Sequence, residues 1–182
     1  MVGNLIPRKR LIIFDKDGCL CKSVVEKSGK SHAPNRLEDQ EYFEDVAAKC
    51  AELKAAGNTL AVASNQGGVA FGIFPADEAE LLVSAAAEYI GAAGYRVCFY
   101  HPKGKVKPYD MESHNRKPNP GMLESLMAEF GFHPQDTLFV GDWETDRQAA
   151  RAAGCGFEWA HVFFGRVDPF ADRLHSMLGA QE

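Results

Sequence analysis

The sequence predicts an α/β protein, a three-layer, Rossmann-like parallel sheet with helices on both faces. Short apolar runs alternate with helical patterns along most of the 182 residues, which is typical of a parallel sheet. The polar motifs come directly after the apolar runs, and ligands bind at the carboxyl ends of the strands in such sheets. Because we find no internal repeat and no low-complexity segment, we expect a single domain over residues 1–182.

Composition is that of an ordinary soluble protein, with 46% hydrophobic and 25% charged residues. No run of about 18 apolar residues predicts a membrane span, and the first seven residues are not apolar enough for a signal peptide. The five cysteines are scattered, as expected in a reducing compartment, so we expect a cytoplasmic protein with no membrane partner. A net charge of −5 does not favour general adhesion to nucleic acid.

The apolar runs and their boundaries predict the individual elements. Strands are expected at residues 11–14, 59–63, 95–100, 137–140 and 157–160. Helices are expected at residues 38–56, 77–93, 120–130, 145–153 and 168–178. Asp77 and Asn119 are predicted N-caps, Pro120 is a typical first helical residue, and Gly57 and Gly154 are typical helix stops. The intervening residues 19–36 are polar.

Two carboxylates stand at the end of the first strand. Asp15 and Asp17 are two residues apart, so both side chains are expected on the same side of the extended chain. Two carboxylates about 4 Å apart repel by roughly 4 kcal/mol at an effective dielectric near 20. A divalent cation with oxygen ligands would offset that repulsion. The alternative is a strand that ends in an Asx turn, where Asp and Gly are also common.

Three further strand or loop ends carry polar groups. Residues 64–68 (Ser-Asn-Gln-Gly-Gly) follow the second strand, Lys117 precedes a helix, and Asp142 follows the fourth strand with Asp146 four residues on. Taken singly, Ser64 could end a strand, Lys117 could be a surface charge and Asp146 could cap a helix. Together at one edge of the sheet they would suit a phosphoryl group and a metal ion.

These stretches resemble the four ordered motifs of the haloacid dehalogenase (HAD) superfamily. They are residues 15–18 (Asp-Lys-Asp-Gly), 64–68, 116–122 (Arg-Lys-Pro-Asn-Pro-Gly-Met) and 141–146 (Gly-Asp-Trp-Glu-Thr-Asp). The pattern is most similar to subfamily IIIA, with its histidinol-phosphate, heptose-bisphosphate and polynucleotide 3′-phosphatases. No long insertion follows the first or second motif, so the resemblance implies a minimal (C0) cap. Residues 19–38 and the 101–115 loop are the segments available to cover the site.

The resemblance implies a role for each motif residue. Asp15 would be the nucleophile that forms an aspartyl-phosphate, and Asp17 the general acid and base. Mg²⁺ would be bound by Asp15, the backbone carbonyl of Asp17, and Asp142. Ser64, with the amides around Asn65, would bind the transferring oxygens, and Lys117 would stabilise the charge. The remaining implied residues are Asp146, which orients Lys117 or a metal-bound water, and the substrate-binding Asn65, Arg116 and Trp143.

The chain departs from the family at a zinc loop. Of the four positions that carry zinc ligands in related phosphatases, here Cys98, Tyr100, Ser113 and Asn115, one keeps a ligand. We therefore expect no structural zinc of that kind. A rearranged site with Cys98, His101 and His114 stays an alternative, as does simple packing of Cys98 in a strand.

Other departures bear on the substrate. Trp143 stands where related sugar phosphatases place a basic residue, and its ring would suit a sugar or a base, or would pack against residues 26–36. The basic Lys103 to Lys107 loop would either guide an anionic substrate or form a solvated face. Cys19 replaces a usual Thr or Val with a weaker hydrogen-bond group, and a Cys19–Cys21 redox pair is a further alternative.

The motifs favour a Mg²⁺-dependent phosphomonoester hydrolase acting on a small phosphorylated sugar or metabolite, such as a heptose bisphosphate. The alternative substrate is a nucleic-acid 3′-phosphate end. The non-enzymatic alternative is a phosphoacceptor switch like a receiver domain, but Asp17 is placed to hasten loss of a phosphoryl group from Asp15. A phosphomutase would need a cap that excludes water. We expect a monomer or a small homo-oligomer.

Overall fold

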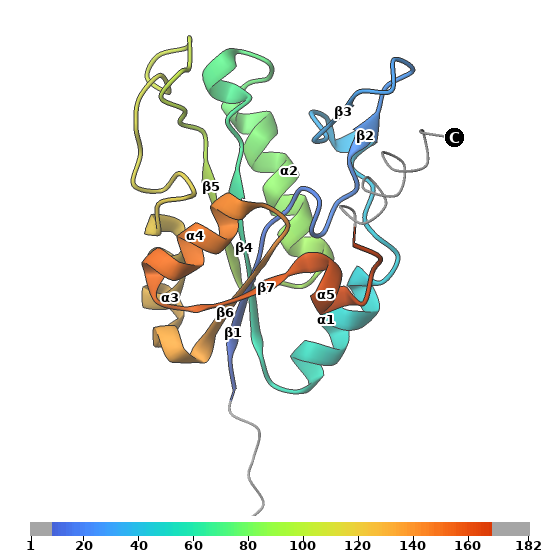
Figure 1. Cartoon of the computed structure of the whole chain (residues 1–182), viewed down its shortest axis with the longest axis vertical. Coiled ribbons are helices and arrows are strands. Elements are labelled where there is room, and N and C mark those ends of the chain that lie inside the picture. The colour runs from blue at the N-terminus through green and yellow to red at the C-terminus, as the bar shows by residue number, and fades with distance from the viewer. Residues whose placement is uncertain (1–8, 169–182) are drawn as a thin grey trace, which may run out of the picture.

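The structure is a computed structural model, and it describes residues 9–168. A five-stranded parallel sheet in the order β5-β4-β1-β6-β7 forms its centre (Figure 1). Its strands are β1 (Leu11–Phe14), β4 (Thr59–Asn65), β5 (Gly94–Cys98), β6 (Thr137–Gly141) and β7 (Gly156–Trp159). The predicted α/β architecture with a parallel sheet is confirmed.

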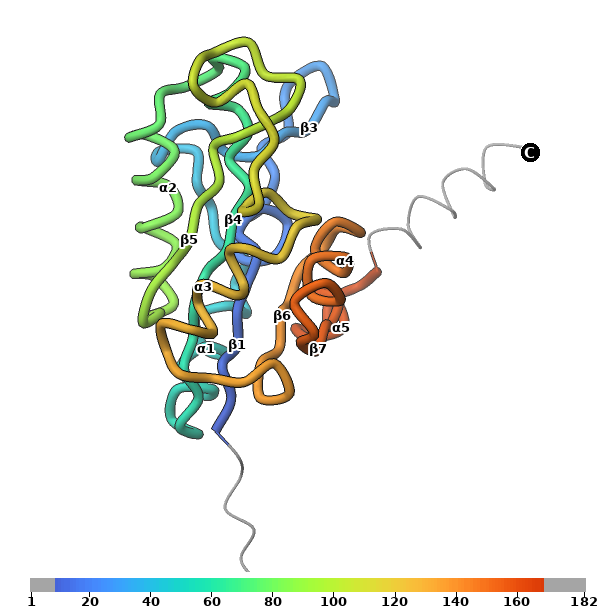
Figure 2. The backbone as a smooth tube through the Cα atoms, turned by 90° about the vertical axis from the view of Figure 1, so that its left-hand side faces the viewer, coloured from blue at the N-terminus to red at the C-terminus, as the bar shows by residue number. Residues whose placement is uncertain are grey.

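Helices cover both faces of this sheet (Figure 2). On one face lie α1 (Val46–Ala55), α2 (Ala76–Tyr89) and α5 (Ala160–Phe164), and on the other lie α3 (Gly121–Phe130) and α4 (Glu144–Ala153). The three short 3₁₀ helices of the described chain are η1 (Leu37–Asp39), η2 (Val69–Phe71) and η3 (Pro134–Asp136). Two layers of helix therefore enclose a central sheet.

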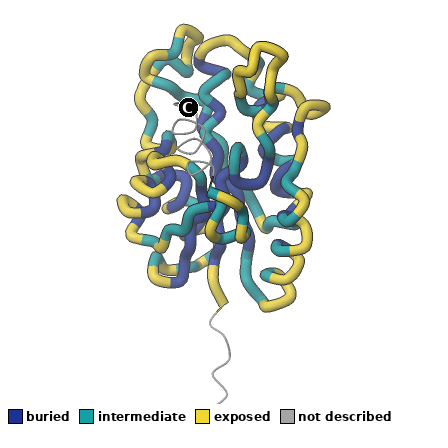
Figure 3. Tube along the Cα trace, turned by 45° about the vertical axis from the view of Figure 1, so that its right-hand side comes forward, coloured by how far each residue is buried: buried dark blue, intermediate teal, exposed yellow. Residues whose placement is uncertain are grey.

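The alternation of side chains along β1 explains the two helical layers. Ile12 and Phe14 belong to the cluster under α1 and α2, whereas Leu11 and Ile13 belong to the cluster under α3 and α4. All four are at most 3% exposed. A central parallel strand is buried on both faces, so it reads as one continuous apolar run. Figure 3 shows the buried positions concentrated along these central strands.

The segment after β1, residues 19–39, forms a small flap. It contains a two-stranded antiparallel hairpin, β2 (Val24–Val25) and β3 (Ser31–His32), followed by η1. The hairpin lies beside the upper end of the sheet in Figure 1. This arrangement agrees with the predicted minimal cap. No helix within residues 9–168 is long and apolar enough to cross a membrane.

The helix predicted at residues 38–56 is shorter than expected, because α1 begins at Val46. Residues 40–43 instead run alongside the loop that follows β1. Lys22 N–H donates to the Glu41 carbonyl at 2.8 Å, and Phe43 N–H donates to the Leu20 carbonyl at 3.1 Å. Tertiary pairing thus overrides local helix propensity here.

Two predicted N-caps are wrong. Pro75 precedes α2, which begins at Ala76 and ends at Tyr89, so Asp77 lies inside its first turn. Pro120 precedes α3, while the Asn119 side-chain amide donates to the Ser113 carbonyl at 2.9 Å. Both predicted caps are thus one or two residues from the true boundary.

The helix predicted at 77–93 ends four residues early, at Tyr89. The remaining boundaries differ by one or two residues. β4 extends to Asn65, β5 ends at Cys98, and β6 extends to Gly141. The last strand ends at Trp159 because α5 begins at Ala160. Gly154 ends α4 in the left-handed region at φ 73°, as predicted. The helix expected at 168–178 lies outside the described residues, apart from its first position.

Candidate active site

The end of β1 places Asp15 at the middle of the carboxyl edge of the sheet. Because β1 lies between β4 and β6, the residue that follows it faces loops from both neighbours. Asp15 N–H donates to the Val140 carbonyl at 2.9 Å, which continues the β1–β6 ladder by one residue. The Asp15 side chain is 10% exposed. The Asp15 carboxylate is therefore held at the base of the site, at the carboxyl edge of the sheet.

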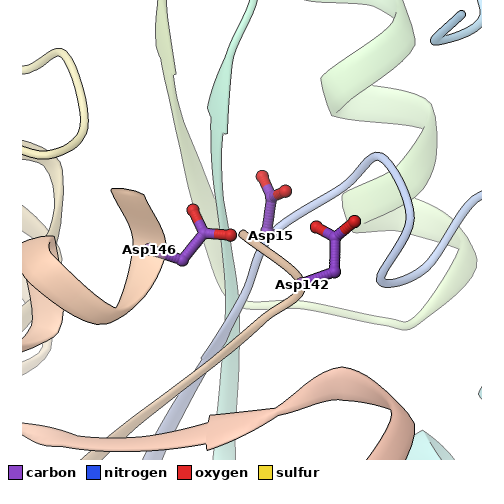
Figure 4. Close-up of side chains that lie close together, drawn as sticks. All are labelled: Asp15, Asp142 and Asp146. Carbon is purple, nitrogen blue, oxygen red and sulfur yellow. The ribbon is translucent and has the colours of Figure 1, made fainter. Parts of the chain in front are cut away.

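Three carboxylates converge at this point. Asp15 comes from the end of β1, Asp142 from the loop after β6, and Asp146 from the first turn of α4 (Figure 4). One carboxylate oxygen from each lies within 4.8 Å of those from the other two. One Asp142 oxygen, Oδ1, is buried without a hydrogen-bond partner in the described chain. Such a group of hard oxygen ligands with an unsatisfied buried atom fits a divalent cation.

Lys117 provides the cation within this cluster. Its Nζ lies 2.6 Å from Asp15 Oδ1 and 2.7 Å from Asp146 Oδ1, and it donates to the Ala63 carbonyl at 3.1 Å. Its side chain is 3% exposed, so all three donor positions are used inside the protein. A buried lysine of this kind needs two carboxylates to compensate its desolvation. Lys117 is thus held directly beside the predicted nucleophile.

The Asn65 side chain fixes Lys117 rather than reaching into open space. Its Oδ1 accepts from Lys117 N–H at 3.1 Å and its Nδ2 donates to the Lys117 carbonyl at 3.0 Å. Both polar atoms of the Asn65 amide are thereby occupied by one backbone unit. The structure connects the end of β4 with the loop before α3 through this pair.

Burial and mutual repulsion make the acidic cluster reluctant to ionise. Burial raises the pKa of Asp15 to about 7, against the opposing effect of Lys117 and with the help of Asp146 and Asp17. Burial and the nearby charges of Asp15 and Asp146 raise the pKa of Asp142 to about 8. Burial also lowers the pKa of Lys117, but its ion pairs with Asp146 and Asp15 outweigh this and leave the pKa above its usual value. If all three were ionised, these carboxylates would carry more negative charge than Lys117 neutralises.

Asp17 lies above the cluster with donors on both carboxylate oxygens. Lys16 Nζ donates to Asp17 Oδ1, and Gln66 Nε2 donates to Asp17 Oδ2 at 2.9 Å. Lys16 is fully buried, and its Nζ also donates to Gln40 Oε1 at 3.2 Å. The Asp17 side chain is 21% exposed, so it borders the opening of the site.

Gly18 is required by the position of Asp142. Its φ of +80° is in the left-handed region, and a Cβ built there would lie 2.0 Å from Asp142 Oδ2. The glycine of the first motif thus permits the carboxylate of the fourth motif to pack against the backbone. This contact draws two distant parts of the sequence into one site.

Two hollows meet at Trp143. The first, of about 190 Å³, contains three of the four predicted catalytic residues, Asp15, Asp17 and Lys117; its other lining residues are Ala33, Asn65, Trp143, Thr145 and Asp146. The second, of about 400 Å³, also has Trp143 in its lining and combines aromatic and hydroxyl groups, among them Ser23, Ser31, Phe43 and His161. Trp143 is 65% exposed, so its ring faces the hollows and solvent and is not packed under residues 26–36.

Two predicted site residues line neither hollow. Ser64 ends β4 as predicted but is 1% exposed, and its hydroxyl accepts a hydrogen bond from Gln66 Nε2 at 2.9 Å. The Arg116 guanidinium lies near Gly67 and His101, and its Nη1 donates to the Tyr100 carbonyl at 3.0 Å. The structure thus brings Asp15, Asp17, Asn65, Lys117, Trp143 and Asp146 to the first hollow, whereas Asp142 lines the second hollow with a carboxylate oxygen within 4.8 Å of those of Asp15 and Asp146.

The residues of the alternative metal site are separated. Within residues 9–168, the acidic trio is the sole group of three or more His, Cys, Asp or Glu side chains close enough to share an ion. Cys98 is buried in β5, His101 packs against Phe71, and His114 pairs with Glu124. Cys19 and Cys21 are free buried thiols, and Cys19 Sγ contacts the Val140 carbonyl at 3.5 Å.

Sequence reasoning missed the buried polar residues around Asp17. Gln66 is 3% exposed and Lys16 is fully buried, although each stands in a polar motif typical of a solvated loop. Ala33 and Thr145 also line the first hollow without having been predicted. A motif position was the available signal for Gln66, Lys16 and Thr145, which lie in the motifs at 64–68, 15–18 and 141–146.

Comparison with known proteins places this site in a family. The HAD-hydrolase-like family matches residues 114–158. The D-glycero-beta-D-manno-heptose-1,7-bisphosphate 7-phosphatase of Escherichia coli strain K12 is 32% identical over 150 residues, which cover 80% of this chain and 75% of that protein. The chain belongs to the HAD superfamily.

The predicted enzyme class is confirmed by this relationship: the chain is a HAD-type phosphatase. The phosphatase of the same name from Rhodopseudomonas palustris is 28% identical and covers 81% of both chains. A structure of D,D-heptose 1,7-bisphosphate phosphatase from B. bronchiseptica, complexed with magnesium and phosphate, superposes with a TM-score of 0.67 at 24% identity. It covers 81% of this chain and 78% of that one, and supports the same fold.

Proposed function

We propose that this HAD phosphatase hydrolyses the phosphate monoester of a small phosphorylated sugar or related metabolite, with Mg²⁺ and through an aspartyl-phosphate on Asp15. The observation that carries the proposal is the convergence of Asp15, Asp142 and Lys117 in one buried cluster. The matched relatives named heptose-bisphosphate 7-phosphatases support the substrate class.

The acidic cluster fits a magnesium ion. Asp15 and Asp142, with the backbone carbonyl of Asp17, would hold it, and the unpaired Asp142 Oδ1 would gain a partner. When bound, Mg²⁺ supplies the positive charge that offsets repulsion between the Asp15 carboxylate and a phosphate dianion. Burial raises the pKa values of Asp15 and Asp142, and repulsion from the neighbouring carboxylates raises them further, an effect that a bound cation would offset.

The residues of the chain then divide the reaction into two displacements. In the first, an Asp15 oxygen attacks phosphorus, the bond to the leaving oxygen breaks, and Asp17 gives its proton to that oxygen. In the second, Asp17 takes a proton from water, the water oxygen attacks phosphorus, and the bond to Asp15 breaks. Lys117 remains beside Asp15 throughout and stabilises the charge of the transferring group.

The leaving group would lie against Trp143. Trp143 is 65% exposed and lines both the catalytic hollow and the wider one. An aromatic face packs well against the apolar face of a sugar ring, and the hydroxyls of Ser23 and Ser31 offer hydrogen bonds to its edge. Ser64, at the end of β4, and Arg116, in the loop before α3, line neither hollow, so they make no direct contact with the phosphate in this proposal.

A phosphate-release screen tests this function. Purified protein with Mg²⁺ is offered sugar monophosphates, sugar bisphosphates, histidinol phosphate, nucleotides and a 3′-phosphorylated oligonucleotide. We expect release from sugar phosphates that stops when Mg²⁺ is chelated and falls by at least about 10³-fold in Asp15→Asn, because the nucleophile is lost. Preference for the oligonucleotide would replace the sugar as substrate class. Full activity of Asp15→Asn would contradict the mechanism.

We also propose a cytoplasmic location. All five cysteines are free thiols in the structure, and four of them are buried. Free thiols persist in reducing compartments. Fractionation of cells that express the native chain would test this, and light scattering of the purified protein would determine whether it is a monomer or a small homo-oligomer.

A further inference from the structure

Gln66 is a buried polar residue to which the proposed mechanism assigns no role. It lies just after β4, is 3% exposed, and its N–H donates to the Cys98 carbonyl at 2.8 Å, which fixes its backbone to the end of β5. Its side-chain amide nitrogen donates to Asp17 Oδ2 and to Ser64 Oγ, each at 2.9 Å. Both hydrogens of that amide group are therefore committed.

We propose that Gln66 is a positioning residue for the general acid and base Asp17, an inference that rests on the proposed function. Asp17 lies in the loop after β1, whereas Ser64 ends the neighbouring β4. The Gln66 amide joins these two segments by a short path of two hydrogen bonds. The carboxylate of Asp17 is thus held at a fixed place relative to the strand ends that carry the reacting groups.

Asp17 accepts a hydrogen bond on each carboxylate oxygen, and Gln66 is the donor to only one of them. Lys16 Nζ holds Oδ1, and Lys16 is itself tied to Gln40 Oε1, so that oxygen is anchored to the flap side. Gln66 holds Oδ2 from the opposite side. A carboxylate oxygen has two lone pairs, so each oxygen retains one for a proton. The two donors can therefore fix the orientation of Asp17 without blocking proton transfer.

A positioning role for Gln66 predicts a loss of activity that depends on the substrate, which a general loss of stability would not produce. The value of kcat/KM reports the steps up to the transfer of phosphate to Asp15, and in those steps Asp17 protonates the leaving oxygen. p-Nitrophenolate leaves readily without a proton, whereas the alkoxide of glycerol 2-phosphate requires one. Misplacing Asp17 should therefore harm the second substrate far more than the first.

The experiment compares these two substrates in wild type and Gln66→Met, which keeps the length of the side chain and removes its donors. We expect kcat/KM for glycerol 2-phosphate to fall at least about tenfold more than kcat/KM for p-nitrophenyl phosphate. Gln66→Glu, which retains the shape of the side chain, should change the ratio of the two kcat/KM values in the same direction. It replaces Gln66→Met in the comparison if the methionine variant does not fold. Thr137→Val is the matched control, because it removes a buried hydroxyl that donates to His133, far along β6 from the site.

A double-mutant cycle with Asp17→Asn tests whether Gln66 acts through Asp17. If Gln66 acts through Asp17, the Gln66→Met change should leave the substrate ratio of Asp17→Asn unaltered within about twofold. Equal losses on both substrates, or a ratio that still changes in the Asp17→Asn background, would overturn the role of Gln66 while leaving the phosphatase intact. A wild-type protein that hydrolyses neither substrate with Mg²⁺ would overturn the proposed function, and the role of Gln66 with it.

Discussion

At the scale of single residues, the site is a balance of buried charges. Asp15 and Asp146 share Lys117, while Asp142 has an unsatisfied Oδ1 and packs its Oδ2 against Gly18. The sequence alone predicted the acidic residues and the lysine, because all of them follow strands or precede a helix at one edge of a parallel sheet. It did not predict Gln66 or Lys16 as buried, since their burial depends on the path of loops that have no periodic pattern.

Gly18 and Gly29 offer a matched pair for testing the packing of Asp142. Both have φ of +80°, but a Cβ on Gly18 would meet Asp142, whereas a Cβ on Gly29 has nothing within 4 Å. Each alanine substitution should cost about 1–2 kcal/mol for the left-handed conformation. Gly18→Ala should also weaken Mg²⁺ binding by at least about tenfold because Asp142 is displaced. Calorimetric titration with Mg²⁺ measures this, and equal Mg²⁺ affinity in the two variants would show that Asp142 does not depend on Gly18.

At the scale of elements, α4 links the fold to the site. Asp146 at its first turn accepts from Trp143 N–H at 3.0 Å through Oδ2 and pairs with Lys117 through Oδ1. The helix start was predicted within one residue, since a polar residue and an acidic first turn are typical of it. The helix before β4 was predicted too long because residues 40–43 pair with the loop after β1.

Substitutions at Asp146 separate its two tasks. Asp146→Asn keeps an acceptor for Trp143 N–H but removes one anionic partner of Lys117, so we expect kcat to fall by about tenfold or more. Asp146→Ala removes the acceptor as well, and its free energy of unfolding should be about 1 kcal/mol lower than that of Asp146→Asn. Urea unfolding of both variants measures the difference. Equal stabilities would indicate that the side chain contributes nothing to the start of α4.

At the scale of the whole molecule, the buried thiols make the free energy of unfolding decrease at alkaline pH. Burial raises the pKa of Cys21 and Cys50 to about 12, and that of Cys155 to about 11, from an ordinary value of 9.0. The unfolded chain releases these protons near pH 9, whereas the folded chain retains them. Their contribution to stability is therefore complete below pH 9 and is lost as the pH rises from there toward 12.

This pH dependence can be assigned to a single thiol. The free energy of unfolding in urea should decrease between about pH 8 and about pH 10.5 in the wild type, and should decrease less in Cys50→Ala. Cys50 is 1% exposed in α1, away from the acidic cluster, so the catalytic groups do not enter the comparison. An identical decrease in both proteins would rule out the Cys50 thiol as a source.

The fold as a whole was more predictable than its details. Continuous apolar runs identify central parallel strands, and the sheet then fixes where the strand ends meet. The flap hairpin was not predicted, because two-residue strands carry no pattern. The separation of Cys98, His101 and His114 depends on how the 99–120 segment folds, which composition does not determine.

The most direct test of the account is to identify the phosphorylated residue. The enzyme is mixed with substrate and Mg²⁺, quenched in acid during turnover, reduced with borohydride and digested for mass spectrometry. Borohydride converts an aspartyl-phosphate to homoserine, so the account predicts homoserine at position 15 and none in the Asp15→Asn variant. Homoserine at another aspartate, or its absence during steady hydrolysis by the wild type, would contradict it.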